Sequence, residues 1–512
     1  MLVKTYAAAL QGITATVITI EVNSTKGIQF FLVGLPDVAV KESHERIISA
    51  LEYNGYKFPR TRIVINMAPA DIRKEGSAYD LPLAIGVLAA AESIDSSRLD
   101  QFMMMGELSL DGNLLPVKGV LPIAIKAQEA GFRGLIVPKQ NAREAAVVSG
   151  LEVYGVDNIL EVIQFMDGKR ELERTVVDVR EDFYRRQQLF EFDFSEVRGQ
   201  ENVKRALEVA ASGGHNIIMI GPPGSGKSML AKRLPSILPP FTLNEALETT
   251  KIHSVAGKIS SDTSLMAQRP FRSPHHTISN VAMVGGGSFP QPGEISLAHN
   301  GVLFLDELPE FNRAVLEVLR QPLEDRRISI SRVRFNVDYP ASFMLVASMN
   351  PCPCGYYNHP ERNCLCPPGA VQKYMNRISG PLLDRIDIQV EIVPVPFEKI
   401  SDRTPSERSE AVRERVVRAR AIQEKRFADC EGIYCNAQME AKQLHQFAVP
   451  DKAGLTKLKN AMEKLNLSAR AYDRILKVAR TIADLDGSEK VTADHIGEAI
   501  NYRNLDRETW GG

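Results

Sequence analysis

The chain has 512 residues, of which 44% are hydrophobic and 24% charged, and its formal net charge is -1. These values are typical of a globular protein with several domains, and they exclude a chain that binds nucleic acid through its overall charge. No apolar stretch approaches the ~20 residues of a membrane span, and the N-terminus lacks the apolar core of a signal peptide. Six cysteines are too few for a disulfide framework in a chain of this length, so the expected location is the reducing cytoplasm.

The first 167 residues alternate strand-like and helix-like stretches, which predicts an α/β or α+β domain. Residues 168–191 are dense in charge and are interpreted as a linker or an exposed helix. Strands are expected over 15–22, 28–33, 62–67 and 134–138, and helices over 38–53, 81–91 and 121–131.

A second α/β segment covers residues 192–395, and its clearest feature is a glycine-rich loop. The apolar run Ile217–Ile220 precedes the loop, and a helix-forming stretch follows it, which is the strand–loop–helix setting of a P-loop. Lys227 would reach the β- and γ-phosphates of ATP, and the Ser228 hydroxyl would ligate Mg²⁺. The residues expected to bind ATP are Gly221, Pro222, Pro223, Gly224, Ser225, Gly226, Lys227, Ser228 and Met229.

Two further apolar strands end in polar residues. The first, ending at Leu305, leads into Asp306 and Glu307. Asp306 would hold Mg²⁺, and Glu307 would orient and deprotonate the attacking water. The second strand leads to Asn350, which would contact the γ-phosphate or the water, although an Asn after a strand is also a common turn residue.

Four cysteines lie within one short segment, Cys352, Cys354, Cys364 and Cys366. Two close pairs of thiolates can complete a tetrahedral zinc shell, and four thiolates leave no open position, so such a metal would be structural. The C-x-C spacing is tighter than the usual C-x₂-C, and free thiols in a loop are the alternative. His359 is a substitute ligand.

Four further motifs indicate one particular group of ATPases. They are Arg269–Thr277 (RPFRSPHHT), Val284–Gly287, Gln291–His299 and Phe304–Phe311. Together with the three strands they resemble the magnesium-chelatase-like AAA+ ATPases, most closely the ComM/YifB family, over essentially the whole chain. The resemblance implies an ATP-dependent homo-oligomeric ring, a hexamer. It further implies a DNA helicase that drives branch migration on branched DNA, or on junctions of single-stranded and duplex DNA, during natural transformation.

The resemblance also assigns functional roles to several arginines. Arg385, in Ser379–Asp387, matches the arginine finger that reaches the γ-phosphate in the next subunit, although this segment is equally a salt-bridged helix end. Arg470 matches the sensor-2 arginine, which would contact ATP in its own subunit, with Arg474 one turn further as the alternative. Val197–Gln200 resembles the segment that cradles adenine.

The same resemblance places a hairpin over residues 325–339 at the central pore. Arg332 and Arg334 would then face DNA phosphates, although an ordinary solvated hairpin is the other interpretation. The insert His275–Gly293 is a second candidate pore loop. The arginine-rich stretch 406–426 carries interspersed glutamates, which favours a solvated face.

The N-terminal segments Pro69–Pro82 and Gly112–Leu121 resemble the proteolytic domain of Lon. The catalytic serine position falls on Ala78 and the lysine position on Leu121, whereas Ser77 and Lys118 are nearby but out of place. The expectation is a protease-like fold without protease activity.

Two other functions stay open as alternatives: an ATP-dependent protein remodeller or protease, and a metal-chelatase partner, for which the chain carries no obvious porphyrin chemistry. The expected fold class is a multidomain α/β chain. It comprises a Lon-protease-like (ribosomal S5-like) domain over 1–167, a linker over 168–191, an AAA+ P-loop α/β core over 192–395 with a zinc-binding insertion at 352–366, and an α-helical lid over 396–512.

Overall fold

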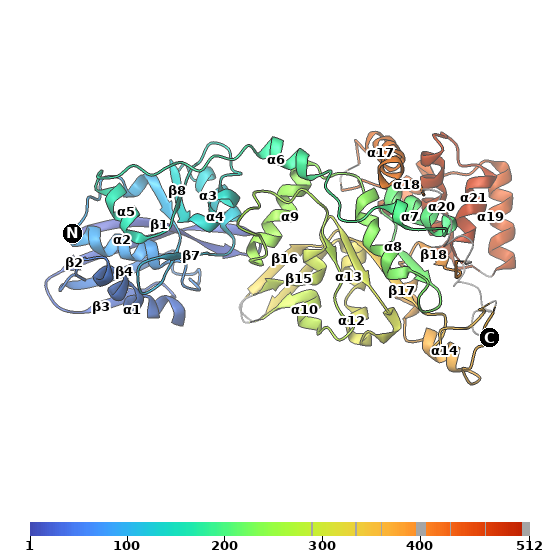
Figure 1. Ribbon diagram of the computed structural model, residues 1–512, viewed down its shortest axis with the longest axis horizontal. Helices are drawn as coiled ribbons and strands as arrows, with labels where there is room; N and C mark the ends of the chain where they lie inside the picture. The colour runs from blue at the N-terminus through green and yellow to red at the C-terminus, as the bar shows by residue number, and fades with distance from the viewer. Residues whose placement is uncertain are drawn as a thin grey trace. The chain divides into compact units, whose positions relative to one another are not determined.

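The computed structural model of the chain (Figure 1) describes residues 1–287, 290–332, 335–359, 361–395, 406–430, 432–465 and 467–503, without the side chains of Arg332 and Phe335. The chain divides into two compact units. The first comprises Met1–Arg186 and Leu243–Ala267, and the second comprises Gln187–Thr242 and Gln268–Gly512. None of the described helices is long and apolar enough to cross a membrane.

The first unit is built on a mixed sheet whose described strands have the order β3-β4-β2-β1-β5-β8-β9. β1–β2 and β2–β4 pair antiparallel, and the other neighbours pair parallel. The strands are β1 (Leu2–Gln11), β2 (Thr14–Thr25), β3 (Phe30–Val33), β4 (Arg62–Ala68), β5 (Phe102–Met104), β8 (Gly134–Pro138) and β9 (Glu152–Val156), with β6 (Glu107–Leu108) and β7 (Leu114–Leu115) forming a separate hairpin.

The helices of the first unit follow the expected apolar pattern. α1 begins after Asp37, whose carboxylate accepts the Val40 N–H. α2 is buried along its whole length, because all its residues are apolar except Asp80, which pairs with Arg46. The charged stretch 168–191 contains α6, in which Phe183 is buried. The helices are α1 (Val38–Tyr53), α2 (Asp80–Ala90), α3 (Val120–Glu129), α4 (Lys139–Ala145), α5 (Ile159–Met166), α6 (Val179–Arg186) and α9 (Leu243–Val255).

Helix α9 belongs to the first unit, although its sequence lies between the P-loop and Asp306. The Gly119 N–H donates to the carbonyl oxygen of Ser254 at 3.0 Å, and the Ser254 hydroxyl donates to buried Glu144. Glu144 also accepts the Leu121 N–H at 3.0 Å. The end of α9 is therefore held by hydrogen bonds at the beginning of α3.

The second unit contains a parallel sheet of order β11-β14-β17-β10-β18. The central strands are buried and apolar, as is typical of a parallel sheet with both faces covered. Because all the strands run the same way, the loops that follow β10, β14 and β17 meet at one edge. The strands are β10 (Ile217–Ile220), β11 (Phe271–Arg272), β14 (Val302–Leu305), β17 (Met344–Met349) and β18 (Ile388–Glu391).

The C-terminal helices share the core of this second unit, in which α20 packs against α7, α17 and α21. The expected α/β core followed by helices is confirmed. The helices are α7 (Glu201–Gly213), α8 (Lys227–Arg233), α10 (Asn280–Val284), α11 (Glu294–Leu297), α12 (Arg313–Glu317), α13 (Arg320–Asp325), α14 (Ala370–Met375), α15 (Gly380–Leu383), α17 (Ser409–Arg426), α18 (Ala441–Phe447), α19 (Lys452–Lys464), α20 (Ala469–Leu485) and α21 (Ala493–Asn501).

Two short hairpins complete the second unit. The predicted hairpin is confirmed: β15 (Arg327–Arg332) pairs antiparallel with β16 (Phe335–Pro340). The second hairpin pairs β12 (Gly285–Gly286) with β13 (Gln291–Pro292), within the insert between β11 and β14.

Candidate functional site

The loop after β10 has the backbone conformation that its glycines permit. Gly224 and Gly226 have φ angles of +78° and +89°, a region that residues with side chains avoid. Gly221 follows β10 directly, and a Cβ there would lie 2.7 Å from the carbonyl oxygen of Ile392. The loop thus closes between β10 and α8, as a phosphate-binding loop does.

Lys227, the first residue of α8, lies back over this loop. Its Nζ donates to the carbonyl oxygens of Gly221 at 2.8 Å and Pro222 at 2.9 Å, and to Asn350 Oδ1 at 3.2 Å. Burial lowers the pKa of Lys227, against the opposing effect of the Asp306 charge. The ammonium is therefore a donor already directed into the site.

Asp306, directly after β14, accepts hydrogen bonds from two serines. Ser228 Oγ lies 2.7 Å from Asp306 Oδ2, and the Ser348 hydroxyl donates to Oδ1. Ser348 lies in β17, the strand that pairs with β14. Ser348 was not predicted as a site residue, because its only signal in the sequence is its position two residues before Asn350 near the end of an apolar strand.

Glu307 follows in a left-handed conformation with φ +54°, which is uncommon for a residue with a side chain and directs the chain sharply away from β14. Its N–H donates to Asp306 Oδ1 at 3.1 Å, and its side chain is 57% exposed. His276 Nδ1 lies 3.8 Å from Glu307 Oε2. This histidine was not singled out, although it lies in the RPFRSPHHT motif.

Asn350 completes the arrangement at the end of β17. The Gly221 N–H donates to the carbonyl oxygen of Met349 at 3.1 Å, so the P-loop and the end of β17 are directly joined. The structure therefore brings Lys227, Ser228, Asp306 and Asn350 together at the carboxyl edge of the sheet, with Glu307 beside them.

A small cavity of about 60 Å³ lies beside the P-loop, lined by Gly221 and Pro222 on one side and by Val393 on another. Gln200, from the expected adenine segment, donates through Nε2 to the carbonyl oxygen of Val393 at 2.7 Å. Gln200 of the expected adenine segment thus contacts a residue that lines the cavity beside the phosphate loop.

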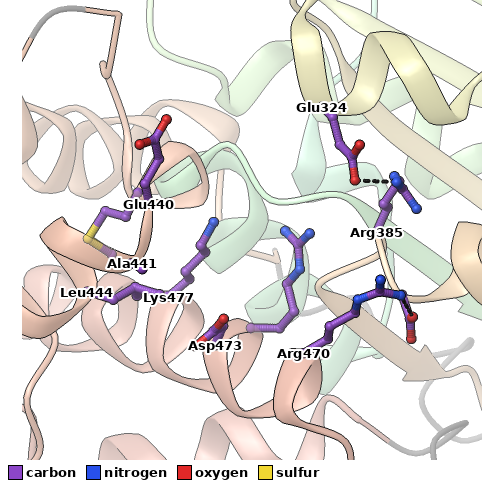
Figure 2. Close-up of a pocket in the computed structure, with 11 residues that line it drawn as sticks. Glu324, Arg385, Glu440, Ala441, Leu444, Arg470, Asp473 and Lys477 are labelled. Atoms are coloured by element: carbon purple, nitrogen blue, oxygen red, sulfur yellow. Dashed lines mark hydrogen bonds and ion pairs between the residues drawn. The ribbon is translucent and has the colours of Figure 1, made fainter.

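Arg385 and Arg470 line a second cavity of about 240 Å³, shown in Figure 2. Arg385 forms an ion pair with Glu324, and Arg470 Nη1 lies 2.8 Å from Asp384 Oδ2. Positively and negatively charged side chains both line this cavity. The lining residues are Glu324, Asp384, Arg385, Met439, Glu440, Ala441, Leu444, Arg470, Asp473, Arg474 and Lys477.

This cavity lies toward the amino edge of the sheet. Asn216 immediately precedes β10, its carbonyl oxygen accepts the Asp387 N–H at 3.0 Å, and its Nδ2 donates to the Arg385 carbonyl oxygen at 2.9 Å. The P-loop follows the other end of the same strand. The structure therefore does not bring Arg470 to the P-loop of its own chain, where it was expected to contact ATP. Its ion pair with Asp384 holds the first turn of α20 at the opposite edge of the sheet.

A buried polar cluster fixes the segment after Arg385 to the helical region. His215 Nδ1 lies 3.1 Å from Asp387 Oδ2, and its Nε2 lies 2.7 Å from Thr481 Oγ1. Arg474 donates to Asp387 Oδ1 at 2.9 Å. Burial opposes the charged carboxylate, but Arg474 and His215 hold the pKa of Asp387 far below its usual range. Burial lowers the pKa of His215.

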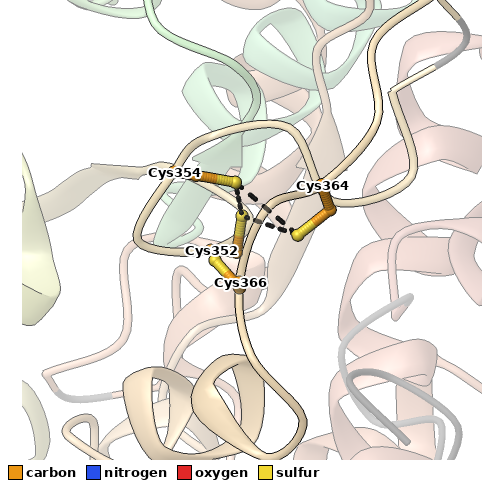
Figure 3. Close-up of side chains that lie close together, drawn as sticks. All are labelled: Cys352, Cys354, Cys364 and Cys366. Carbon is orange, nitrogen blue, oxygen red and sulfur yellow. Dashed lines mark hydrogen bonds between the residues drawn. The ribbon is translucent and has the colours of Figure 1, made fainter.

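The cysteine sulfurs gather at one point, as Figure 3 shows. The Sγ atoms of Cys352, Cys354, Cys364 and Cys366 all lie within 4.8 Å of one another, and none of the described cysteines forms a disulfide. His359 is not part of this group. Its Nδ1 accepts the N–H groups of Glu361 and Arg362.

The expected DNA contacts fall largely outside the described residues. Arg334 and the side chain of Arg332 are not described, so their role stays a prediction. The backbone of Arg332 ends β15 at the tip of the hairpin.

The protease-like segments of the first unit hold no serine–lysine pair among their described residues. Ala78 and Leu121 occupy the two positions matched to the protease, and Leu121 is fully buried. Lys118 is exposed, and Ser77 is partly exposed. No hydrogen bond joins the two side chains in the described part of the chain, so this region lacks the geometry of a dyad.

Comparisons with known families match three stretches of the chain. Residues 193–400 match the model "Magnesium chelatase, subunit ChlI", residues 20–141 match "Subunit ChlI of Mg-chelatase", and residues 406–503 match "Magnesium chelatase, subunit ChlI C-terminal". Over 157 residues the chain is also 28% identical to Lon protease 2 of Bacillus subtilis, covering 28% of this chain and 27% of the protease.

Two relatives match over nearly their full lengths. Competence protein ComM of Haemophilus influenzae is 44% identical over 507 residues, covering 98% of this chain and 97% of the relative. The protein YifB of Escherichia coli is 45% identical over 505 residues, with the same coverage of both chains. The sequence similarity, the P-loop site and the parallel sheet agree, and this chain belongs to the ComM/YifB family of magnesium-chelatase-like AAA+ ATPases.

Proposed function

We propose that the chain is an ATP-driven, ring-shaped DNA motor of the cytoplasm. It would act as a helicase or branch-migration translocase on recombination intermediates during natural transformation. The proposed ATPase activity is supported by the positions of four side chains that meet at one edge of the sheet, those of Lys227, Ser228, Asp306 and Asn350. The DNA part is supported by the relative named Competence protein ComM.

The side chains have distinct roles in hydrolysis of MgATP, the substrate. Lys227 exchanges the carbonyl oxygens of the loop for phosphate oxygens, and Ser228 and Asp306 hold Mg²⁺. Glu307 accepts a proton from the water that attacks the γ-phosphorus, and ADP leaves. Asn350, already hydrogen-bonded to Lys227, orients the γ-phosphate or the water.

Arg385 and Arg470 would serve the site of a neighbouring subunit. Both lie toward the amino edge of the sheet, whereas their own P-loop lies at the carboxyl edge. Positive charge at that edge can stabilise the transition state only where another subunit presents its ATP. This supports an ATP-dependent homo-oligomeric ring, and a hexamer is the proposed size.

The proposed domains are the expected ones at 1–167, 192–395 and 396–512 with the linker 168–191, although residues 243–267 pack with the first unit and the last two domains share one core. Branched DNA or a junction of single-stranded and duplex DNA would contact the hairpin β15–β16 through Arg332 and Arg334. A structural Zn²⁺ ion at the cysteine cluster is a separate proposal, because it concerns the support of the loop and not the motor reaction.

ATP hydrolysis measured with and without branched DNA tests the DNA motor. DNA should stimulate the wild-type ATPase several-fold, and the double substitution Arg332→Gln and Arg334→Gln should remove the stimulation while the basal rate persists. Stimulation by an unfolded protein such as casein, and not by DNA, would favour the protein remodeller. ATP-dependent casein cleavage that requires Ser77 would favour the protease, although Ala78 and Leu121 stand at the two positions matched to the protease dyad.

A further inference from the structure

The cysteine segment lies directly against the P-loop. It begins two residues after Asn350, and its Gly355 packs on the second proline of the phosphate loop. Gly355 is buried with φ +83°, and a Cβ there would lie 2.6 Å from Cδ of Pro223. The cavity of about 60 Å³ is lined by Pro222 on the P-loop side and by Gly355 and His359 on the other.

The distances between the sulfurs fit a tetrahedral metal. Sγ of Cys364 lies 3.8 Å from Sγ of Cys352 and 3.6 Å from Sγ of Cys354, and the last two sulfurs are 3.2 Å apart. A tetrahedral Zn²⁺ ion with Zn–S bonds of about 2.3 Å holds its sulfurs about 3.8 Å apart. Small movements of the side chains would therefore complete the shell.

The segment is held by turns and by side-chain contacts such as that of Arg362 with the Tyr356 ring and hydroxyl, and not by regular secondary structure. Between β17 and α14 it forms turns with no helix or strand among its described residues, and one of its internal backbone bonds is the Gly355 N–H to the Cys352 carbonyl oxygen at 3.0 Å. Cys352 is fully buried, whereas the other three cysteines of the group are partly exposed. A four-thiolate metal would supply the cross-link that such a loop requires.

We propose that the four thiolates bind one Zn²⁺ ion and that this closed site braces the P-loop through the contact of Gly355 with Pro223. Four protein ligands leave no position for a substrate, so the ion is structural. Occupancy of this site by Zn²⁺ determines how firmly the P-loop is held, and therefore the affinity of the P-loop for ATP. The second part rests on the ATP site proposed above, whereas zinc binding does not.

Two glycines allow a matched pair of substitutions. Gly355 and Gly369 both have positive φ, +83° and +77°, so alanine introduces similar backbone strain at each. A Cβ at position 355 meets Pro223, whereas a Cβ at position 369 meets nothing within 4 Å. Only Gly355→Ala should disturb the P-loop, while both variants retain the four cysteines.

The experiment measures metal content and nucleotide affinity of the full chain. Purified wild type should contain one zinc per chain, and replacement by Co²⁺ should give the absorption bands of a tetrahedral four-thiolate site. Cys364→Ser should lose the metal. With a fluorescent, non-hydrolysable ATP analogue and Mg²⁺, Gly355→Ala should keep the metal and raise the Kd by about tenfold, and Gly369→Ala should bind as wild type does.

Wild type that binds neither Zn²⁺ nor Co²⁺ overturns the metal site. Equal nucleotide affinity of Gly355→Ala and Gly369→Ala, with the metal retained, overturns the brace. A wrong assignment of the P-loop gives a different result from a wrong assignment of the brace. In that case Lys227→Ala would bind the ATP analogue as tightly as wild type does.

Discussion

Ser228 Oγ lies 2.7 Å from Asp306 Oδ2, although 78 residues separate the two in the chain. Ser228 is the second residue of α8, and Asp306 follows β14, which is separated from β10 by β17. Their hydroxyl and carboxylate are the two groups that hold Mg²⁺ in P-loop ATPases. Their contact therefore marks where the metal of the proposed MgATP complex would bind.

Lys227→Ala should lower the rate of ATP hydrolysis by about 100-fold or more, because a charged donor to the phosphates is lost. Lys232→Ala is the matched control, since Lys232 lies on the same helix α8 and is exposed. Hydrolysis is measured as phosphate release at saturating ATP. Normal turnover by Lys227→Ala would contradict the P-loop assignment.

Ser348→Ala should raise the Mg²⁺ concentration needed for half-maximal hydrolysis by about tenfold, because residues that orient a metal ligand typically affect affinity to this extent. Ser348 donates to the Asp306 oxygen that does not face Ser228. Ser260→Ala, which removes a hydroxyl in the first unit, is the control. An unchanged Mg²⁺ titration would remove Ser348 from the site.

Mixtures of two inactive variants test whether Arg385 acts on a neighbour. A subunit carrying Arg385→Ala has an intact P-loop, and a subunit carrying Lys227→Ala has an intact arginine. If the arginine acts between subunits, random mixing at equal amounts restores about a quarter of the interfaces. Activity should therefore reappear when the variants are mixed before assembly, and mixtures that stay as inactive as their components would contradict this role.

The same mixing test applies to Arg470. The ion pair with Asp384 places it beside Arg385, so Arg470→Ala should also be rescued by Lys227→Ala. Rescue of Arg385→Ala without rescue of Arg470→Ala would return Arg470 to the site of its own subunit.

Asp387→Asn should lower the free energy of unfolding by about 3 kcal/mol at pH 7, because it breaks a buried ion pair. Arg474 and His215 depress the pKa of Asp387, so this contribution is fully present above the unfolded pKa of about 4, begins to decrease below it and is lost as the pH falls through the depressed folded-state pKa. Asp486→Asn is the control, since its side chain is 51% exposed. Urea unfolding followed by circular dichroism at pH 7 and pH 3.5 measures both variants. A difference that does not shrink at the lower pH would contradict the assigned pKa shift.

The parts predicted from the sequence are those that depend on local pattern. Lys227, Asp306 and Asn350 each follow an apolar strand, and parallel strands bring their carboxyl ends to one edge. Ser348 lies inside a buried strand, where a serine gives no functional signal until the pairing of β17 with β14 is known.

Features that depend on packing between distant parts of the chain could not be predicted from the sequence. The contact of Arg470 with Asp384 depends on how α20 packs against the core, which no spacing in the helix encodes. Helix α9 lies between two motifs of the ATP site in the sequence, yet its hydrogen bonds are with the beginning of α3. The zinc hypothesis depended on spacing alone until the fold placed all four sulfurs together.

ATP-dependent resolution of a synthetic branched DNA tests the central claim most directly. Wild type should separate the branches with MgATP and fail without ATP, and Glu307→Gln should bind ATP and DNA but leave the branches joined. Glu310→Gln is the matched control, because this exposed carboxylate three residues further on pairs with Arg377 and should be dispensable. Wild type that hydrolyses ATP and binds the branched DNA but does not resolve it would contradict the account.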